Sequence, residues 1–467
     1  MAFSEFLNSR RNDCKDLVSE LTKTFPYVGI LGSDVRSTVI GVDKNMRDIS
    51  EGSLSECGFV IKMHNGKAFY EYSLDDICGN KKDLAEKIIS SVRLSEKMAQ
   101  REIIVPAPAD EPLVRSFERQ CDFENYTDEQ LLDFAKSVSD GILAADPNFV
   151  NAVVRILPFT VSKLFVSPNR ELDQFYSWAN VIAIGVYSNG EKMVLPREGT
   201  YSNLLGEAMD AFPEKIPVLA EKARKLATAK PIVPGVYDVI TDPSISGLIA
   251  HEAFGHGVEM DQFVKDRALA KQYVGKYVAS PICNMHDGAA AAFSTASYFF
   301  DDDGVLACDT QIIRDGILVS GISDLVSATE LGTTPTGNGR RQSYKRKAYT
   351  RMTNTFFSPG KDKLEDMISS IKHGYMLFET NNGMEDPKNW QIQCTAEYGI
   401  EIVDGKLTDN YVSPVVMSGS VPDLLKSISM VSDDFRIIGM GACGKGYKEW
   451  VRVSDGGPAL KVRVKLA

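Results

Sequence analysis

Six consecutive residues, His251-Glu252-Ala253-Phe254-Gly255-His256, place two imidazoles and a carboxylate close together in a chain that has only five histidines. Histidine is the commonest side-chain metal ligand near neutral pH. A glutamate beside a metal-binding histidine is what a zinc hydrolase uses to activate a water molecule. The motif therefore predicts a catalytic zinc site with His251 and His256 as ligands and Glu252 as general base.

The spacing of the two histidines requires an irregular backbone. They lie five positions apart, whereas H-E-x-x-H sites place them four apart on one helix face. On a regular helix, a spacing of five separates two side chains by roughly 140°, too far for them to share one ion. We therefore predict a π-bulge or an unwound last turn at Ala253–His256, which would bring His256 beside His251. The alternative is a helix C-terminus with two capping histidines.

Two histidines leave a catalytic zinc site one protein ligand short. Cys443 is a candidate because glycines on both sides of it permit a tight loop, and Lys445 would lower the pKa of its thiol. From these residues alone, a buried structural thiol is an equally good interpretation. Glu259 is either a carboxylate that orients a ligand or a surface residue.

Length and composition indicate two large domains of a globular protein. The chain has 467 residues, of which 43% are hydrophobic and 25% charged. The net charge of −11 argues against a nucleic-acid partner. The one basic stretch, Arg340–Lys347, is interpreted as a solvated loop; the alternatives are a phosphate or carboxylate patch, or a segment that lines the substrate path.

The sequence also favours a cytoplasmic location. No apolar stretch is long enough to span a membrane, and the N-terminus lacks the pattern of a secretory signal. The eight cysteines are scattered without a C-x-x-C pair, as is typical of reduced thiols. We therefore expect a cytoplasmic protein that has no membrane partner.

Hydrophobic periodicity and turn residues predict an α+β fold in both halves of the chain. A Pro/Gly break at 230–235 divides an N-terminal α+β domain (1–229) from a C-terminal domain (230–467). In the second domain, an antiparallel or mixed sheet should pack against the helix that carries the HExxxH motif, which opens at Asp242-Pro243. The predicted helices include 4–24, 83–98, 127–144, 214–229, 363–370 and 421–428, and the predicted strands include 153–157, 160–166, 180–187, 236–240, 297–300, 311–314, 397–403 and 406–412. Hairpins are predicted at Asn65-Gly66 and Asn189-Gly190, and turns at the Asp-Gly pairs 303–304, 315–316 and 404–405.

Several segments, in the same order along the chain, resemble the TldD/PmbA family, and specifically its TldD branch of zinc peptidases, some members of which have been named modulators of DNA gyrase. The resemblance covers most of residues 235–467, and the N-terminal half matches more weakly around Gly58–Tyr72. The matching segments are 251–259, 298–304, 336–341, 351–355 with 359–360, 398–401 and 443–445.

The resemblance implies a zinc metalloprotease in which His251, His256 and Cys443 bind the metal and Glu252 is catalytic. It implies short or unfolded peptides as substrates, held by strand-like backbone pairing. It also implies a dimer, either a homodimer or a heterodimer with a PmbA/TldE-like subunit, with the N-terminal domain serving substrate binding and dimer formation. One departure is that Gly446-Tyr447-Lys448 follows Lys445, where the family often has C-G-K-x-G-Q.

Two other functions use the same residues. A non-enzymatic, zinc-stabilised peptide-binding subunit of a TldD/PmbA-type complex would keep the ligands, but a structural zinc site needs no base, so Glu252 argues against it. An amidase that acts on modified peptides would use the same chemistry as a peptidase. The sequence therefore predicts a zinc-dependent peptidase as the leading function.

Overall fold

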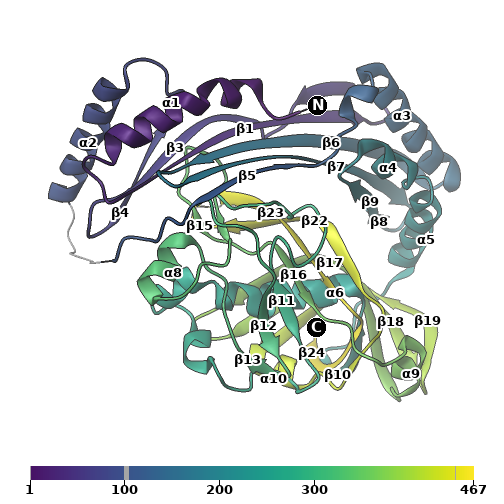
Figure 1. Cartoon of the computed structure of the whole chain (residues 1–467). Coiled ribbons are helices and arrows are strands. Elements are labelled where there is room, and N and C mark those ends of the chain that lie inside the picture. Colours follow the sequence, from purple (N-terminus) through teal and green to yellow (C-terminus); the bar gives the residue numbers. More distant parts are fainter. Residues whose placement is uncertain (1, 99–104, 448) are drawn as a thin grey trace.

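The computed structural model describes residues 2–98, 105–447 and 449–467, which form a mixed α+β structure (Figure 1). In these ranges the strands that precede residue 229 all belong to one nine-stranded sheet of order β4-β3-β1-β6-β7-β5, with β2 paired to β1 and both β8 and β9 paired to β7. Its strands are β1 (Tyr27–Val42), β2 (Arg47–Glu51), β3 (Glu56–His64), β4 (Phe69–Leu74), β5 (Leu113–Glu118), β6 (Phe149–Val166), β7 (Arg170–Ser188), β8 (Met193–Val194) and β9 (Arg197–Ser202).

Helices cover the upper face of this sheet in Figure 1, and the second half of the chain lies beneath its lower face. The helices are α1 (Glu5–Leu21), α2 (Lys81–Met98), α3 (Asp128–Ala145), α4 (Leu205–Asp210) and α5 (Lys215–Thr228), with the short 3₁₀ turn η1 (Phe123–Asn125). Ser4 caps α1 through Leu7 N, and Thr127 forms a capping box with Gln130 at the start of α3. The four helices predicted in this half are confirmed to within a few residues.

The longest strands differ from the prediction. Segments 153–157 and 160–166 were expected as separate strands, but Pro158 lies inside the continuous strand β6 and is paired with Ala179 of β7. Proline has no N–H to donate to a sheet ladder. The β1–β6 register accommodates it, because the pairing passes from Ser37↔Phe159 directly to Ile40↔Ile156 and so leaves Pro158 unpaired on that side.

The second half of the described chain contains a closed ring of strands and a separate sheet. β10 pairs with both β17 and β24, which closes the ring β10-β17-β18-β20-β24, and the other large sheet has the order β13-β12-β11-β16-β23-β22. These strands are β10 (Gly235–Thr241), β11 (Met285–Asp287), β12 (Thr310–Arg314), β13 (Ile317–Leu318), β14 (Gly339–Arg340), β15 (Tyr349–Thr350), β16 (Asn354–Phe357), β17 (His373–Asp386), β18 (Gln391–Val403), β19 (Lys406–Val412), β20 (Val415–Ser420), β21 (Met430–Val431), β22 (Arg436–Lys445), β23 (Glu449–Gly457) and β24 (Leu460–Leu466).

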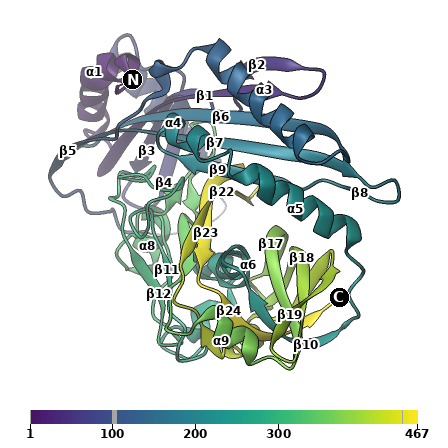
Figure 2. The same cartoon turned by 90° about the vertical axis from the view of Figure 1, so that its right-hand side faces the viewer.

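Helix α6 (Pro243–Leu248) runs between the ring and the β22–β23 hairpin (Figure 2). A Cβ added at Gly247 would lie 2.4 Å from the backbone N of Gly456 in β23, so the helix and the strand pack backbone to backbone there. The remaining short helices are η2 (Ile249–Gly255), η3 (His256–Val258), α7 (Met260–Val264), η4 (Leu269–Tyr273), α8 (Leu325–Leu331), α9 (Leu364–Ser369) and α10 (Val421–Lys426). The predicted helices at 363–370 and 421–428 and the turns at 315–316 and 404–405 are confirmed.

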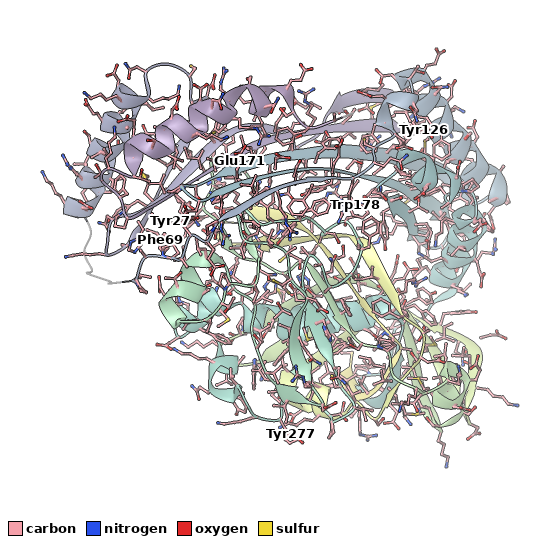
Figure 3. The ribbon with its side chains drawn as sticks, viewed as in Figure 1. Tyr27, Phe69, Tyr126, Glu171, Trp178 and Tyr277 are labelled. Carbon is pink, nitrogen blue, oxygen red and sulfur yellow. The ribbon has the colours of Figure 1, made fainter. Side chains whose placement is uncertain are left out.

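The predicted strand at 297–300 is wrong. Gln174 of β7 takes the backbone hydrogen bonds that a neighbouring strand would have satisfied: its Oε1 accepts from the N–H of Phe299 and of Phe300, and its Nε2 donates to Phe300 O. The segment packs on the lower face of the nine-stranded sheet, where Trp178, labelled in Figure 3, shares a buried cluster with Tyr298.

The two groups of strands separate at the predicted domain boundary. The last strand of the nine-stranded sheet is β9, and the first strand of the other sheets, β10, begins at Gly235. The assignment of two domains itself stays a prediction. No helix within the described ranges is long and apolar enough to cross a membrane.

Candidate metal centre

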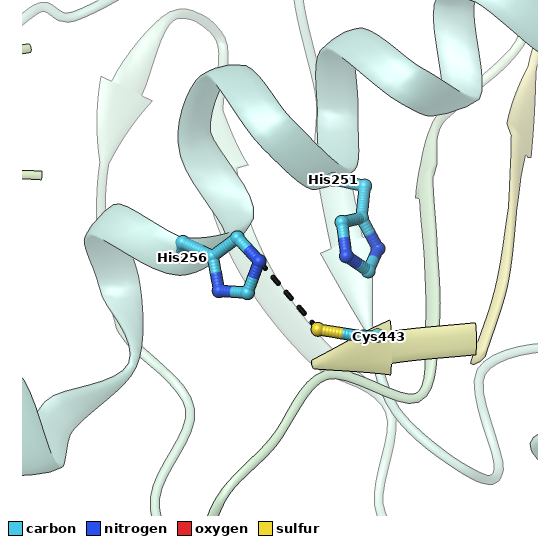
Figure 4. Close-up of side chains that lie close together, drawn as sticks. All are labelled: His251, His256 and Cys443. Carbon is cyan, nitrogen blue, oxygen red and sulfur yellow. Dashed lines mark hydrogen bonds between the residues drawn. The ribbon is translucent and has the colours of Figure 1, made fainter. Parts of the chain in front are cut away.

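The backbone between the two histidines forms the irregular turn that their spacing requires. Asp242 caps α6 by accepting from Ile245 N, with Pro243 in the first turn, and α6 then continues into the π-helix η2. The N–H of His256 bonds to His251 O, a hydrogen bond of five-residue spacing. The imidazole centroids are therefore only 5.2 Å apart, at 89° to one another. The predicted π-type distortion is confirmed, and both rings face Cys443 instead of capping a helix end (Figure 4).

Gly255 permits this turn because the chain is crowded there. A Cβ at that position would lie 2.1 Å from Met352 Sδ and 3.1 Å from Ala250 O. Met352 is fully buried, so it has little room to move away.

Cys443 of β22 completes a three-donor cluster with the two histidines. The ligand atoms of His251, His256 and Cys443 all lie within 4.8 Å of one another, and Cys443 Sγ is 3.5 Å from His256 Nε2 (Figure 4). The three other histidines of the sequence have different partners: His64 contacts Val105 O, His286 contacts Asp309, and His373 contacts Glu401. The structure thus brings together the three residues that the sequence and its resemblance indicate.

The donor set of this cluster fits a zinc ion. Two imidazoles and a thiolate are the ligands that zinc favours over magnesium or calcium, and three protein ligands leave one position free for catalysis. His251 Nδ1 is buried and has no hydrogen-bond partner among the described residues. This nitrogen is the one nearer Asp455, whose Oδ2 lies 4.0 Å away, so the fit to zinc rests on the three donors of the cluster themselves.

The electrostatics of the cluster favour the thiolate. Burial opposes ionisation of Cys443, but the positive imidazole of His256 and the hydrogen bond and charge of His251 outweigh it, so the pKa of the thiol lies well below its usual range. Burial likewise disfavours charged imidazoles, yet contact with Cys443 raises the pKa of His251 to about 9 and that of His256 well above its usual value. The two histidines are the main groups that lower the thiol pKa, and the ammonium group of Lys445 is bonded to Glu259 and Asp261.

Glu252 lies beside the cluster on η2. Its Oε2 is 3.9 Å from His256 Nε2, and its side chain is 18% exposed, so it remains accessible from solvent. Gly383 of β17 packs against it, since a Cβ at Gly383 would lie 2.5 Å from Glu252 Cγ. The strand therefore packs against the π-helix that carries His251 and Glu252.

A chain of hydrogen bonds leads from the cluster through His256. His256 Nδ1 is 3.2 Å from Glu259 Oε2, and Lys445 Nζ donates to Glu259, Asp261 and the carbonyl of Thr350 at 2.9, 2.8 and 2.9 Å. Glu259 is only 1% exposed, so its interpretation as a surface residue is wrong. Contact with Lys445 and His256 lowers its pKa to about 2 although burial opposes ionisation, which keeps this carboxylate charged.

Two neighbours of the cluster were missed by sequence reasoning. Asp455 Oδ2 of β23 is 4.0 Å from His251 Nδ1, and burial raises the pKa of this carboxyl to about 6. Arg351 is buried and donates to the carbonyl of Cys443 at 2.6 Å and to that of Glu449 at 3.1 Å, which holds the β22–β23 hairpin. Asp455 reaches the motif through the position of its strand β23, whereas Arg351 lies between β15 and β16, in a segment that the family resemblance includes; no local pattern signals the contact of either residue with the cluster.

The basic stretch at 340–347 has two environments. Lys345, Arg346 and Lys347 are exposed, as a solvated loop would be. Arg341 is buried and paired with Glu71 of β4 at 3.1 Å, so the loop interpretation is wrong for this residue.

Comparison with known proteins identifies the family. The model of the PmbA/TldA metallopeptidase C-terminal domain matches residues 234–466. A metalloprotease of Methanothermobacter thermautotrophicus is 33% identical over 244 residues, which is 52% of this chain and 52% of that protein. A zinc metalloprotease TldD homolog of Saccharolobus solfataricus is 30% identical over 294 residues, covering 61% of this chain and 65% of that protein. The chain belongs to the TldD/PmbA family of metallopeptidases.

The matches span about half the length of several curated relatives. The fold is shared over a longer range: TldE of Thermococcus kodakarensis superposes with a TM-score of 0.76 at 18% identity, covering 97% of this chain and 100% of TldE. A Thermotoga maritima protein described as a candidate modulator of a DNA gyrase superposes with a TM-score of 0.78, also at 18% identity, over 98% of this chain and 99% of that one.

Proposed function

We propose that this chain is a zinc-dependent peptidase that hydrolyses short or unfolded peptides. The observation that carries the proposal is the cluster of His251, His256 and Cys443, whose ligand atoms lie within 4.8 Å of one another, with the carboxylate of Glu252 beside it. The metalloprotease names of several relatives support the same reaction class.

His251, His256 and Cys443 would hold the zinc ion, which when bound lowers the pKa of a water molecule and polarises a carbonyl group. Glu252 acts as the general base: its carboxylate takes the proton of the attacking water and delivers it to the leaving nitrogen. Glu259 acts through His256, since a carboxylate on Nδ1 orients the imidazole and leaves Nε2 toward the cluster.

An extended peptide would pair with the free edge of β22. Within the described residues β22 is the last strand of its sheet, and Cys443 lies on it. The first part of β22 lies against β9, where Tyr201 Oη donates to Ile437 O, whereas the stretch 441–445 pairs only with β23. Pairing through the main chain reads little of the side-chain sequence, which suits peptides of varied sequence.

The protein would act as a dimer, either with itself or with a PmbA/TldE-like subunit. The similarity of its fold to TldE supports this proposal, because a subunit of the same shape can form a pseudosymmetric pair. Light scattering of the purified chain, alone and mixed with a PmbA-like protein, would distinguish the two assemblies.

The first experiment measures zinc by elemental mass spectrometry in the native protein, in Cys443→Ala and in Cys283→Ala, a buried cysteine outside the cluster. About one zinc per chain is expected in the native protein and in the Cys283 variant, with far less in the Cys443 variant. Digestion of unfolded peptides by the loaded protein would follow. Zinc without hydrolysis would favour the non-enzymatic peptide-binding subunit, and zinc that is indifferent to Cys443 would contradict the site.

A further inference from the structure

A small cavity lies between the nine-stranded sheet and the β22–β23 hairpin. Its volume is about 100 Å³, and its walls include Phe159 and Tyr176 from the sheet and Tyr298 and Trp450 from the second half of the chain. Space of this size accommodates a small polar group together with a few water molecules.

The cavity lies on the other side of the hairpin from the metal ligands. Cys443 is paired with Val451, and Ala442 is paired with Arg452. Residues that are directly opposite share a face of the sheet, and neighbouring residues alternate between faces. Arg452, which lines the cavity, therefore points away from the face that carries Cys443.

Arg452 is only partly exposed, and no carboxylate of the described chain neutralises its charge. Its Nε is buried without a hydrogen bond, and its guanidinium lies 4.3 Å from the centroid of the Phe159 ring. In the amide orientation that satisfies both groups, Asn180 accepts from Arg452 Nη1 at 3.2 Å, but this partner is neutral. Burial lowers the pKa of Arg452 to about 10, so the group remains cationic at neutral pH while its charge is left uncompensated.

A second guanidinium at the cavity, that of Arg340, also has no ion-pair partner in the part of the chain that the structure describes. It donates to Met352 O at 2.7 Å and lies 5.5 Å from the centroid of the Tyr298 ring. The other two cations at the cavity are already paired, Lys163 with Asp302 and Arg341 with Glu71. The carboxyl of Glu56, whose pKa burial raises to about 7, accepts from Tyr344 N and faces no guanidinium closely enough to pair with it.

We propose that this cavity binds an oxyanion, a carboxylate or phosphate group, between Arg452 and Arg340. A buried cation is strongly destabilising unless it is paired, and the planar guanidinium is the side chain best suited to hold these two groups through parallel hydrogen bonds. The aromatic walls would contact the apolar part of a molecule that carries the anion. The proposal is independent of the peptidase reaction, because no metal ligand takes part in the site.

The test is isothermal titration calorimetry of the full chain with sodium acetate, inorganic phosphate, N-acetylalanine and N-acetylalaninamide, at an ionic strength held constant with chloride. Saturable binding of acetate or phosphate is expected. Binding of N-acetylalanine without binding of its amide would identify a carboxylate source, and preference for phosphate would identify a free oxyanion.

Four variants locate the binding. Arg452→Met should weaken it at least tenfold, and Arg340→Met should weaken it as well. Arg115→Met removes an exposed guanidinium and should leave it unchanged. Cys443→Ala should also leave it unchanged, which separates this site from anion binding at a metal.

Absence of saturable binding, or an affinity that Arg452→Met leaves at the native value, would overturn the proposal. If Arg452→Met does not fold, Arg452→Lys and Arg340→Met decide the question. Wild-type affinity in both of these variants would contradict the site.

Discussion

At the scale of single residues, Glu252 has the position that a general base requires. It is partly exposed, it lies next to His256, and Gly383 of β17 fixes its side chain from the other side. None of the contacts described for Glu252 holds the cluster together, so loss of its charge should leave metal binding intact.

Glu252→Gln is therefore expected to retain zinc and to lose peptide hydrolysis by at least about 100-fold, since a positioned general base contributes that much or more. Zinc content and initial rates on an unfolded peptide, measured on one preparation, check both expectations. Glu191→Gln, an exposed glutamate in the hairpin loop between β7 and β8, is the matched control and should behave as the native protein. A Glu252→Gln enzyme that still cleaves at the native rate would contradict the assignment of Glu252 as the general base.

Glu259 has a different role from Glu252. It contacts His256 Nδ1 and Lys445, but it contacts none of the atoms that would bind the metal. Glu259→Gln should weaken zinc affinity by roughly 10- to 100-fold, the usual effect of removing a carboxylate that orients a ligand histidine. Competition with a chromogenic chelator measures this affinity directly. An unchanged affinity would show that the imidazole is held by its own packing.

At the scale of elements, the site depends on how closely α6 approaches β23. The chain continues from α6 into η2 and η3, which carry His251 and His256 toward Cys443 on the neighbouring strand β22, and at Gly247 the backbone of α6 lies against the backbone of β23. A methyl group there cannot be accommodated by the rotation of a side chain.

Gly247→Ala should therefore lower the free energy of unfolding by about 1–3 kcal/mol, the usual cost of overpacking. Urea denaturation of the native protein and the variant measures this loss, and zinc content should fall with it. Gly419→Ala is the control, because a Cβ at Gly419 would meet nothing within 4 Å. Equal stability of the two variants would contradict the close packing of α6 on β23.

The elements also show what the sequence could predict. The five-residue spacing of the histidines required a distorted turn, and the structure has one, because local geometry follows from the chain itself. The Asn65-Gly66 hairpin was equally predictable, with Gly66 at φ 94°. The expected strand at 297–300 failed because Gln174, far away in sequence, takes its backbone hydrogen bonds. Asp455 joins the site through the position of β23, and Arg351 joins it through its hydrogen bonds to the β22–β23 hairpin; both are long-range contacts that no local pattern encodes.

At the scale of the whole molecule, buried ion pairs join the nine-stranded sheet to the second half of the chain. Lys62 pairs with Asp303, Lys163 pairs with Asp302, and Glu71 contacts Arg341 at 3.1 Å and Lys62 at 3.2 Å. Burial opposes the charge on Glu71, but these two cations outweigh it and lower its pKa to about 2. The interface between the two halves is thus stabilised by ion pairs in which Lys62 and Arg341 keep the carboxyl of Glu71 ionised.

This arrangement makes stability depend on pH in a defined direction. A carboxylate whose pKa is lowered on folding stabilises the protein above its unfolded pKa of about 4.5 and loses that contribution as the pH falls toward 2. Glu71→Gln should lower the free energy of unfolding by about 1–2 kcal/mol at pH 7, less than the full pKa shift implies because solvent screens a side chain that is 23% exposed, and the deficit should shrink between pH 4.5 and 2. Thermal unfolding across this range measures it, with exposed Glu51→Gln as the control. A deficit that is the same at every pH would contradict the role of the ionised pair.

The π-helix η2 has one more consequence. Its wide turn holds one residue more than an α-helical turn, so the chain between His251 and His256 behaves as a regular helix that has gained a single insertion. Deleting Ala253 would leave His-Glu-Phe-Gly-His, with the two histidines four apart and on one face of an ordinary α-helix. One residue therefore separates this motif from the common spacing of zinc-binding helices.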